Sequence, residues 1–200
     1  MIVGFVGTID DESDTPISGN GKTCSMTGVA YLDYLSGKEI WSNYETTFSS
    51  QVIGMQKMIE EIGDTPHPDL ILCISEMQLV LNSIGSSINQ VLFIDMFASQ
   101  LRKLDVDIYY DTQRFRNIHK RLRIYTDVIY VPLKCHMDNT PCNNNRCMKP
   151  HKIFLYAHKP YIRKWRKVFD ASKVGKLYNT KEIVTDKLVI PTKKRVKELL

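Results

Sequence analysis

The sequence has 200 residues, of which 43% are hydrophobic, enough for one domain that buries roughly 70% of its unfolded surface. It contains no apolar run of about 18 residues or more and no basic leader followed by an apolar run, which argues against a membrane span and a secretory signal. An odd number of cysteines, 5, argues against a disulfide framework. We therefore expect a soluble protein that is not secreted.

The net charge of +5 hides an uneven distribution of charge along the chain. Residues 1–100 hold 3 lysines and no arginine against 13 acidic residues, a net charge of −10. Residues 101–200 hold 24 lysines and arginines against 9 acidic residues, a net charge of +15. A basic half of this kind indicates a polyanionic partner, unless the asymmetry only produces a dipolar and inert surface.

Strand and helix patterns alternate along the first two thirds of the chain. In chain order, they predict a strand at 2–9, a helix at 23–37, a strand at 39–48, a helix at 53–62, a strand at 69–76, a helix at 88–104, a strand at 106–113, a short helix at 114–122 and a strand at 127–134. This alternation predicts an α/β fold, with a mostly parallel central sheet covered by helices on both faces.

The chain divides by composition into three parts. Residues 1–135 form the predicted α/β core, and residues 136–158 form a hairpin insertion that is rich in cysteine and histidine. Residues 159–200 form a basic C-terminal segment, which we expect to pack on the same domain.

The segment between the first predicted strand and helix has the features of a phosphate-binding loop. Its sequence SGNGKTCS, residues 18–25, completes the motif G-x-x-x-x-G-K-[ST], although Pro16 stands where the first glycine is expected. In such a loop the helix N-terminus binds phosphate, the lysine reaches the terminal phosphates and the threonine hydroxyl ligates Mg²⁺. We place the acidic residues 10–14 in solvent, because their carboxylates would repel a triphosphate. The predicted nucleotide-binding residues are Ser18, Gly19, Asn20, Gly21, Lys22, Thr23 and Cys24.

The most hydrophobic predicted strand, LILCISE, ends in a carboxylate. Glu76 is positioned to act as the base that activates water, unless it is simply a solvated residue at a strand end. Ser75 stands before it, where an aspartate usually supports Mg²⁺, and its hydroxyl could hold the metal through a water molecule.

The next strand leads into a basic segment with further candidate catalytic residues. Gln113, at the end of this strand, could sense the terminal phosphate. Arg121 or Arg123 could reach the site of a neighbouring subunit and stabilise transition-state charge, unless these arginines only form a solvated basic helix.

Together, GxGKT, LILCISE, SQLRKLDVDIYYDTQ, HKRLRIYTDVIY and KLYNTKEIV resemble P-loop ATPases of archaeal and bacterial viruses and mobile elements. These belong to the HerA/FtsK group, which includes viral genome-packaging ATPases, and they are similar to Zot-type phage assembly ATPases. The resemblance covers residues 1 to about 135 and then only the last motif. It implies a RecA-like P-loop core with an additional strand and a catalytic glutamate (ASCE), with Glu76 as that glutamate, Gln113 as the sensor and Arg121 or Arg123 as the finger.

The same resemblance implies a reaction and partners. It implies ATP hydrolysis with Mg²⁺ that drives translocation of double-stranded DNA, most simply to package a viral genome. The implied assembly is a homo-oligomeric ring of five or six subunits that docks on a capsid, portal or membrane protein, in the host cytoplasm or the virion. Two alternatives are a motor of the same fold for virion assembly or secretion, and a nucleotide-binding module whose degenerate site does not hydrolyse ATP.

A cluster of cations with interleaved aromatic residues begins the basic C-terminal segment. Positive charge contacts phosphates without reading sequence, as a translocase requires. The alternative is an ordinary solvated face. The predicted DNA-binding residues are Lys159, Arg163, Lys164, Arg166 and Lys167.

The hairpin insertion contains a possible metal-binding set. Zn²⁺ favours four tetrahedral thiolate and imidazole ligands. The spacing C-x6-C-x4-C-x3-H matches no paired zinc-knuckle pattern, so a local disulfide or an unliganded polar loop are alternatives. The predicted zinc ligands are Cys135, Cys142, Cys147 and His151.

Overall fold

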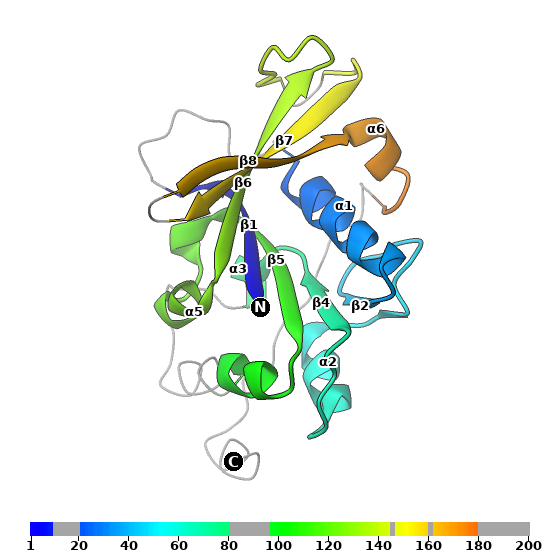
Figure 1. The fold of residues 1–200 in the computed structure, drawn as a ribbon, viewed down its shortest axis with the longest axis vertical. Coiled ribbons are helices and arrows are strands. Elements are labelled where there is room, and N and C mark those ends of the chain that lie inside the picture. The colour runs from blue at the N-terminus through cyan, green and yellow to red at the C-terminus, as the bar shows by residue number, and fades with distance from the viewer. Residues whose placement is uncertain (10–20, 81–96, 145–146, 160–161, 180–200) are drawn as a thin grey trace.

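One eight-stranded sheet runs through the molecule, in the order β3-β2-β4-β5-β1-β6-β7-β8 (Figure 1). The structure is a computed structural model that describes residues 1–9, 21–80, 97–144, 147–159 and 162–179. The strands are β1 Ile2–Thr8, β2 Glu39–Ser42, β3 Gln51–Val52, β4 Leu70–Ile74, β5 Asp107–Arg114, β6 Val128–His136, β7 His151–Lys159 and β8 Ile162–Asp170.

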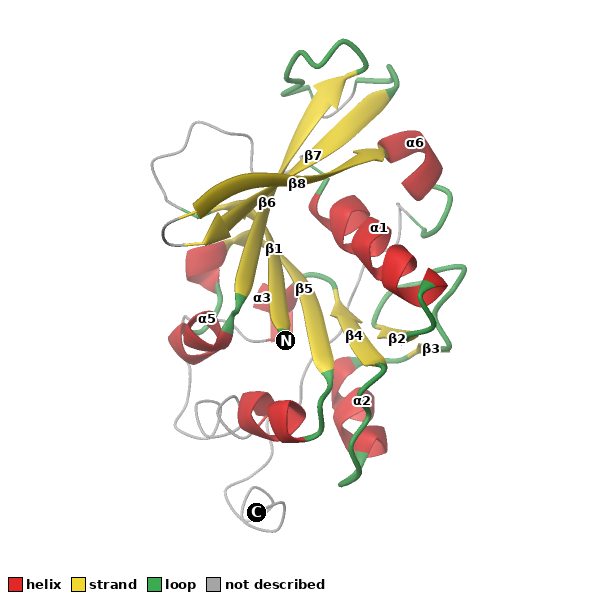
Figure 2. Ribbon diagram, in the orientation of Figure 1, coloured by secondary structure: helices red, strands yellow, loops and turns green. Residues whose placement is uncertain are grey.

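Short helices surround the sheet (Figure 2). They are α1 Lys22–Leu35, α2 Met55–Ile62, α3 Met77–Val80, the 3-10 helix η1 Phe115–Asn117, α5 Lys120–Tyr125 and α6 Ala171–Val174, and residues 97–103 are also helical. In the described part of the chain, none of these helices has the length and apolar character needed to cross a membrane.

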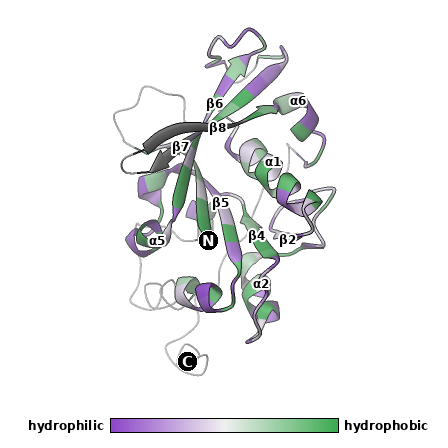
Figure 3. Ribbon diagram, in the orientation of Figure 1, coloured by the Kyte–Doolittle hydropathy of each residue, from purple (hydrophilic) through white to green (hydrophobic). Residues whose placement is uncertain are grey.

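The first six strands of this order, β3 to β6, pair in parallel, as the sequence predicts. All residues of β1 are buried, and so are those of β4, because continuous apolar runs suit parallel strands that are covered on both faces. Figure 3 shows this hydrophobic character of β1 and β4. Strands β7 and β8 extend the sheet in antiparallel fashion beyond β6.

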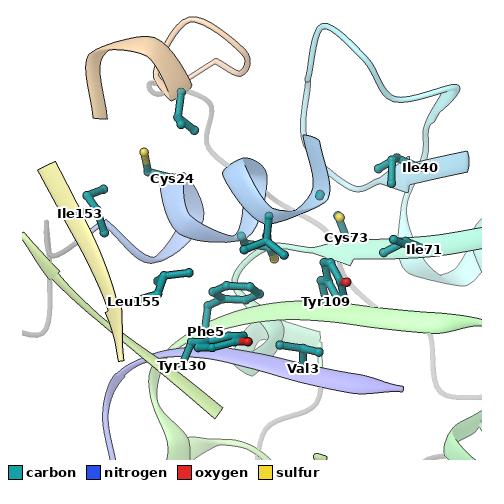
Figure 4. Packing of buried hydrophobic residues seen from close by; sticks show 14 of the residues in the cluster. Val3, Phe5, Cys24, Ile40, Ile71, Cys73, Tyr109, Tyr130, Ile153 and Leu155 are labelled. Carbon is teal, nitrogen blue, oxygen red and sulfur yellow. The ribbon is translucent and has the colours of Figure 1, made fainter. Parts of the chain in front are cut away.

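Two hydrophobic cores lie on opposite faces of the sheet, which confirms the prediction of helices on both faces. One core joins alternate residues of the strands, such as Phe5 and Tyr109, to α1 and α6 (Figure 4). The other joins residues such as Ile108 and Tyr110 to α2, α3, residues 97–103 and α5. Neighbouring residues of a strand point to opposite faces, so β5 contributes to both cores.

Two predicted elements differ from the structure, and a third is only partly described. The strand predicted at 39–48 ends at Ser42, because the following loop turns to pair with the segment after α6 through Thr47 N–H to Leu177 C=O at 2.8 Å. The helix predicted at 114–122 is divided into η1 and α5, where His119 caps α5 by accepting from the Arg121 N–H. Residues 88–96 of the predicted helix 88–104 lie outside the described residues.

Strands β6 and β7 form an antiparallel hairpin that continues the sheet. Strands β6 and β7 pair from Ile129 with His158 to His136 with His151. Strand β8, which the sequence analysis did not predict, then pairs with β7 and forms one edge of the sheet. The predicted division at residue 135 therefore falls within β6, in an uninterrupted sheet.

Candidate functional site

The N-terminus of α1 begins at a glycine whose backbone conformation favours glycine and whose surroundings leave little room for a side chain. Gly21 has φ +89°, in the left-handed region, and a Cβ there would lie 2.5 Å from Ile153 Cδ1 on β7. The first helical hydrogen bond runs from the Ser25 N–H to the Gly21 C=O at 2.8 Å. The N–H groups of residues 22–24 precede this bond, at the positive end of the helix dipole.

Lys22 is buried at the start of this helix, with only 8% of its surface exposed. Burial lowers the pKa of its ammonium group, while the negative charges of Asp111 and Glu76 counter this shift. A lysine in this position provides a positive charge next to two carboxylates, in an environment that water screens weakly.

The carboxylate of Asp111 lies at the centre of the site. Its Oδ2 accepts hydrogen bonds from the Thr23 hydroxyl at 2.5 Å and the Ser75 hydroxyl at 3.1 Å, and its Oδ1 accepts from the Glu76 N–H at 2.7 Å. Asp111 is fully buried. Burial raises the pKa of its carboxyl group, and the hydrogen bonds from Thr23 and Glu76 oppose the rise. These contacts join the start of α1 to the carboxyl ends of β4 and β5.

The sequence analysis missed Asp111, although a signal was present. An aspartate in the middle of the predicted strand DIYYDTQ is unusual, because charged residues are rarely buried for packing alone. The strand ends predict Glu76 and Gln113, whereas Asp111 lies two residues before the end marked by Gln113.

Ser75 and Glu76 follow β4 and are held in place by Asn43, which follows β2. The Asn43 side chain accepts from the Ser75 N–H at 2.7 Å and donates to the Ser75 C=O at 3.1 Å. Glu76 has φ +55°, an unusual value for a residue other than glycine. Gln78 donates a hydrogen bond to its carboxylate. This sharp turn places Glu76 beside Asp111 and Lys22. Four predicted site residues therefore come together there: Lys22, Thr23, Ser75 and Glu76.

The other predicted catalytic residues are arranged differently. Gln113 is exposed near the end of β5, and strand alternation places it on the same face as Asp111. Arg121 is exposed on α5. Arg123 is half-buried near Tyr110, on the opposite face of the sheet from Asp111, and its buried Nε has no hydrogen-bond partner among the described residues.

The remaining nucleotide-loop predictions are only partly tested by the structure. Ser18, Gly19 and Asn20 lie outside the described residues. Cys24 is buried under α6, and burial raises the pKa of its thiol to about 12, which makes it an unreactive packing residue.

The predicted zinc and DNA residues lie on the antiparallel extension of the sheet. The hairpin between β6 and β7 brings together His136, Cys142, Cys147 and His151, so His136 takes the place predicted for Cys135. Burial lowers the pKa of His151, and the charges of Lys134 and His136 add to this effect. The predicted DNA-binding residues are the last residue of β7, Lys159, and Arg163, Lys164, Arg166 and Lys167 of β8.

This arrangement can hold an anion and a hard cation side by side. A helix N-terminus and a buried lysine favour phosphate groups. Carboxylate and hydroxyl oxygens, as supplied by Asp111, Thr23 and Ser75, are the ligands that Mg²⁺ prefers. The carboxylate of Glu76 can accept a proton from water.

Comparison with solved structures identifies the fold. The N-terminal domain of zonular occludens toxin from Neisseria meningitidis matches with a TM-score of 0.54 at 17% identity, covering 89% of this chain and 98% of that domain. The genome packaging NTPase B204 from Sulfolobus turreted icosahedral virus 2, in complex with AMPPCP, matches with a TM-score of 0.50 at 12% identity, covering 83% of this chain and 96% of that one. No family profile and no curated protein matches the sequence. The chain therefore has the α/β fold of P-loop NTPases, as its motifs predict.

Proposed function

We propose that this protein is an ATPase motor that translocates double-stranded DNA, to package a viral genome into a capsid. The observation that carries the proposal is the buried contact of Asp111 with Thr23, beside Lys22 and Glu76, at the N-terminus of a helix. Packing alone gives no reason to bury a lysine and an aspartate together beside a glutamate.

The residues present fit a magnesium ion. Asp111 supplies the negative charge that Ser75 lacks, and the hydroxyls of Thr23 and Ser75 both lie within hydrogen-bond distance of its Oδ2. We assign these three residues to the metal. Bound there, Mg²⁺ would neutralise negative charge on the phosphate oxygens.

The chain's own groups then account for hydrolysis of ATP. The Lys22 ammonium group and the N–H groups at the start of α1 hold the terminal phosphates. The Glu76 carboxylate takes a proton from the water whose oxygen attacks the terminal phosphorus, and ADP leaves. Gln113, on the Asp111 face of β5, orients this water or senses the phosphate.

The coupling to DNA is supported by charge and by one structural neighbour. The second half of the chain has a net charge of +15, and its cations are dense in β8, at an edge of the sheet. The neighbour B204 is described as a genome packaging NTPase. We propose that Lys159, Arg163, Lys164, Arg166 and Lys167 contact DNA phosphates.

Such a motor would work as a homo-oligomeric ring of five or six subunits, docked on a capsid or portal protein in the host cytoplasm or virion. The exposed Arg121 is better positioned than the half-buried Arg123 to reach a neighbouring subunit. We therefore assign the finger role to Arg121.

The proposal is tested by steady-state ATP hydrolysis, with and without Mg²⁺ and double-stranded DNA. We expect Mg²⁺-dependent turnover that DNA accelerates, less so at high salt, and that Lys22→Ala and Glu76→Gln abolish. The matched controls are Lys38→Ala and Glu61→Gln, which alter ion pairs elsewhere on the surface and leave turnover unchanged.

Other outcomes would favour the alternatives. Turnover that DNA does not affect would indicate a motor of the same fold for virion assembly or secretion. Nucleotide binding without turnover, unchanged in Glu76→Gln, would indicate a nucleotide-binding module and would contradict the proposed function.

A further inference from the structure

Two histidines and two cysteines converge at the far end of the β6–β7 hairpin. One potential ligand atom from each of His136, Cys142, Cys147 and His151 lies within 4.8 Å of each of the others. We propose that these four residues bind a structural Zn²⁺ ion. This site is separate from the proposed ATPase site, and it does not depend on that function.

The strand pairing explains why these four residues meet. His136 ends β6 and His151 begins β7, and the two are directly paired in the antiparallel register. Their rings lie 4.9 Å apart between centroids. The connecting loop folds back along β6, through a hydrogen bond from the Cys142 N–H to the Lys134 C=O at 2.9 Å, and so returns Cys142 to the histidine pair.

Cys135 is excluded from this set by the geometry of a strand. Adjacent residues of a strand project from opposite faces, so Cys135 and His136 cannot both point to the same ligand position. Cys135 is buried and lies outside the group of mutually close ligand atoms.

The ring nitrogens provide an independent indication of a ligand. His136 Nδ1 and His151 Nε2 are buried, and neither has a hydrogen-bond partner among the described residues. Buried polar atoms nearly always have a partner, and a pair of unsatisfied imidazole nitrogens next to two thiols calls for an explanation. A shared metal ion would satisfy both nitrogens.

The chemistry and size of the set suit zinc. Two thiolates and two imidazoles in a tetrahedral arrangement are typical of structural Zn²⁺ sites. Bonds of about 2.3 Å to sulfur and about 2.0 Å to nitrogen separate tetrahedral ligand atoms by about 3.3–3.8 Å. The observed limit of 4.8 Å is close enough for small side-chain rotations to reach that geometry.

The position of the cluster suggests what the metal stabilises. His151 and Ile153 lie on the same buried face of β7, and Ile153 packs against Gly21 at the start of α1. A metal at His151 would fix the end of β7 two residues from this contact. The zinc site would thus support the wall of the phosphate loop without contacting nucleotide.

The experiment measures metal content in full-length protein purified without a histidine tag or chelator, under reducing conditions. We expect about one zinc per chain in wild type and in the control Cys135→Ala, and less than about a tenth of that in Cys142→Ser and Cys147→Ser. Cobalt substitution should give visible absorption typical of a tetrahedral site, with charge-transfer intensity for two thiolates. His136→Ala should lose this spectrum while keeping its far-UV circular dichroism.

Three results would overturn the proposal. The first is wild-type protein that contains no zinc and takes up no cobalt. The second is loss of metal in Cys135→Ala equal to that in Cys142→Ser. The third is a count of three thiols instead of five in denatured protein from a parallel preparation made without reductant, which would show a disulfide in place of the metal. None of these results involves ATP hydrolysis, so failure here is distinguishable from failure of the proposed function.

Discussion

The Thr23 hydroxyl donates a 2.5 Å hydrogen bond to Asp111, although the two residues are 88 positions apart in the chain. This contact joins the phosphate loop to the strand beside β4, the strand that leads to Glu76. Ser75 stands where an aspartate usually supports Mg²⁺, and it has no carboxylate. Asp111 supplies a carboxylate next to it.

The Asp111→Asn variant tests this role directly. The amide keeps the shape of the side chain and removes its charge, so we expect metal affinity to fall about 10- to 100-fold, with a corresponding loss of Mg²⁺-dependent turnover. Titration of ATPase activity with Mg²⁺ measures the effect. Asp107→Asn, at the opposite end of the same strand, should leave the Mg²⁺ dependence unchanged. Equal effects in the two variants would contradict the assignment.

Exchanging the side chains of residues 75 and 111 tests whether the carboxylate can act from position 75, where an aspartate usually supports Mg²⁺. Ser75→Asp alone puts a second carboxylate next to Asp111, so we expect lower thermal stability and lower turnover. Combining it with Asp111→Ser restores one carboxylate and one hydroxyl, and should recover part of both. No recovery in the double variant would mean that the position of the charge, and not only its presence, is required.

Burial of Asp111 also predicts a pH dependence of stability without nucleotide or metal. The folded-state pKa is raised by burial above the unfolded value of about 3.9, so the folded state retains the proton more tightly. Wild type therefore loses stability as pH rises from about 4 through the folded pKa.

The Asp111→Asn variant removes this titration, so its stability relative to wild type should rise as the pH rises over the same range. Urea unfolding between pH 4 and 8 measures the difference. A constant difference across this range would show that the pKa of Asp111 is the same in the folded and unfolded states.

A comparison of Gly21→Ala with Gly37→Ala separates the energetic cost of backbone strain from that of a steric contact. Gly37 also has a positive φ, +101°, but a Cβ there meets nothing within 4 Å. Gly37→Ala should therefore cost about 1 kcal/mol in the free energy of unfolding from backbone strain, and Gly21→Ala about 2–4 kcal/mol. Ile153→Val removes the contacting Cδ1 and should rescue part of the larger loss. Additive effects in the double-mutant cycle would rule out the contact between α1 and β7.

The basic strand β8 predicts a measurable salt dependence. If Lys164 and Lys167 contact phosphates, replacing both with alanine should weaken DNA binding and reduce the slope of log affinity against log salt by about 2. ATP turnover without DNA should not change. The control pair Lys57→Ala and Lys103→Ala removes the same charge from exposed positions elsewhere. An unchanged salt slope in the β8 variant would remove this strand from the DNA-binding surface.

The parallel core could be predicted from sequence because its strands are continuous apolar runs and α1 follows a known loop motif. Asp111 could not be placed in the same way. Its partners are 35 to 88 residues away in the chain, and only the order of β4, β5 and β1 in the sheet brings them together. Strand β8 was missed because its sequence, IRKWRKVFD, is rich in cations and shows no regular alternation of apolar and polar residues. The choice between Cys135 and His136 depends on strand register, which ligand spacing in the sequence does not determine.

The loop after β2 is held at two points by distant parts of the chain. Asn43 holds the backbone of Ser75, next to Glu76, and four residues later the Thr47 N–H bonds to the Leu177 C=O. A force on residues 177–179 would therefore be transmitted through residues 43–47 to the turn that contains Glu76. In a motor, this connection would allow mechanical load on residues 177–179 to change the rate of ATP hydrolysis.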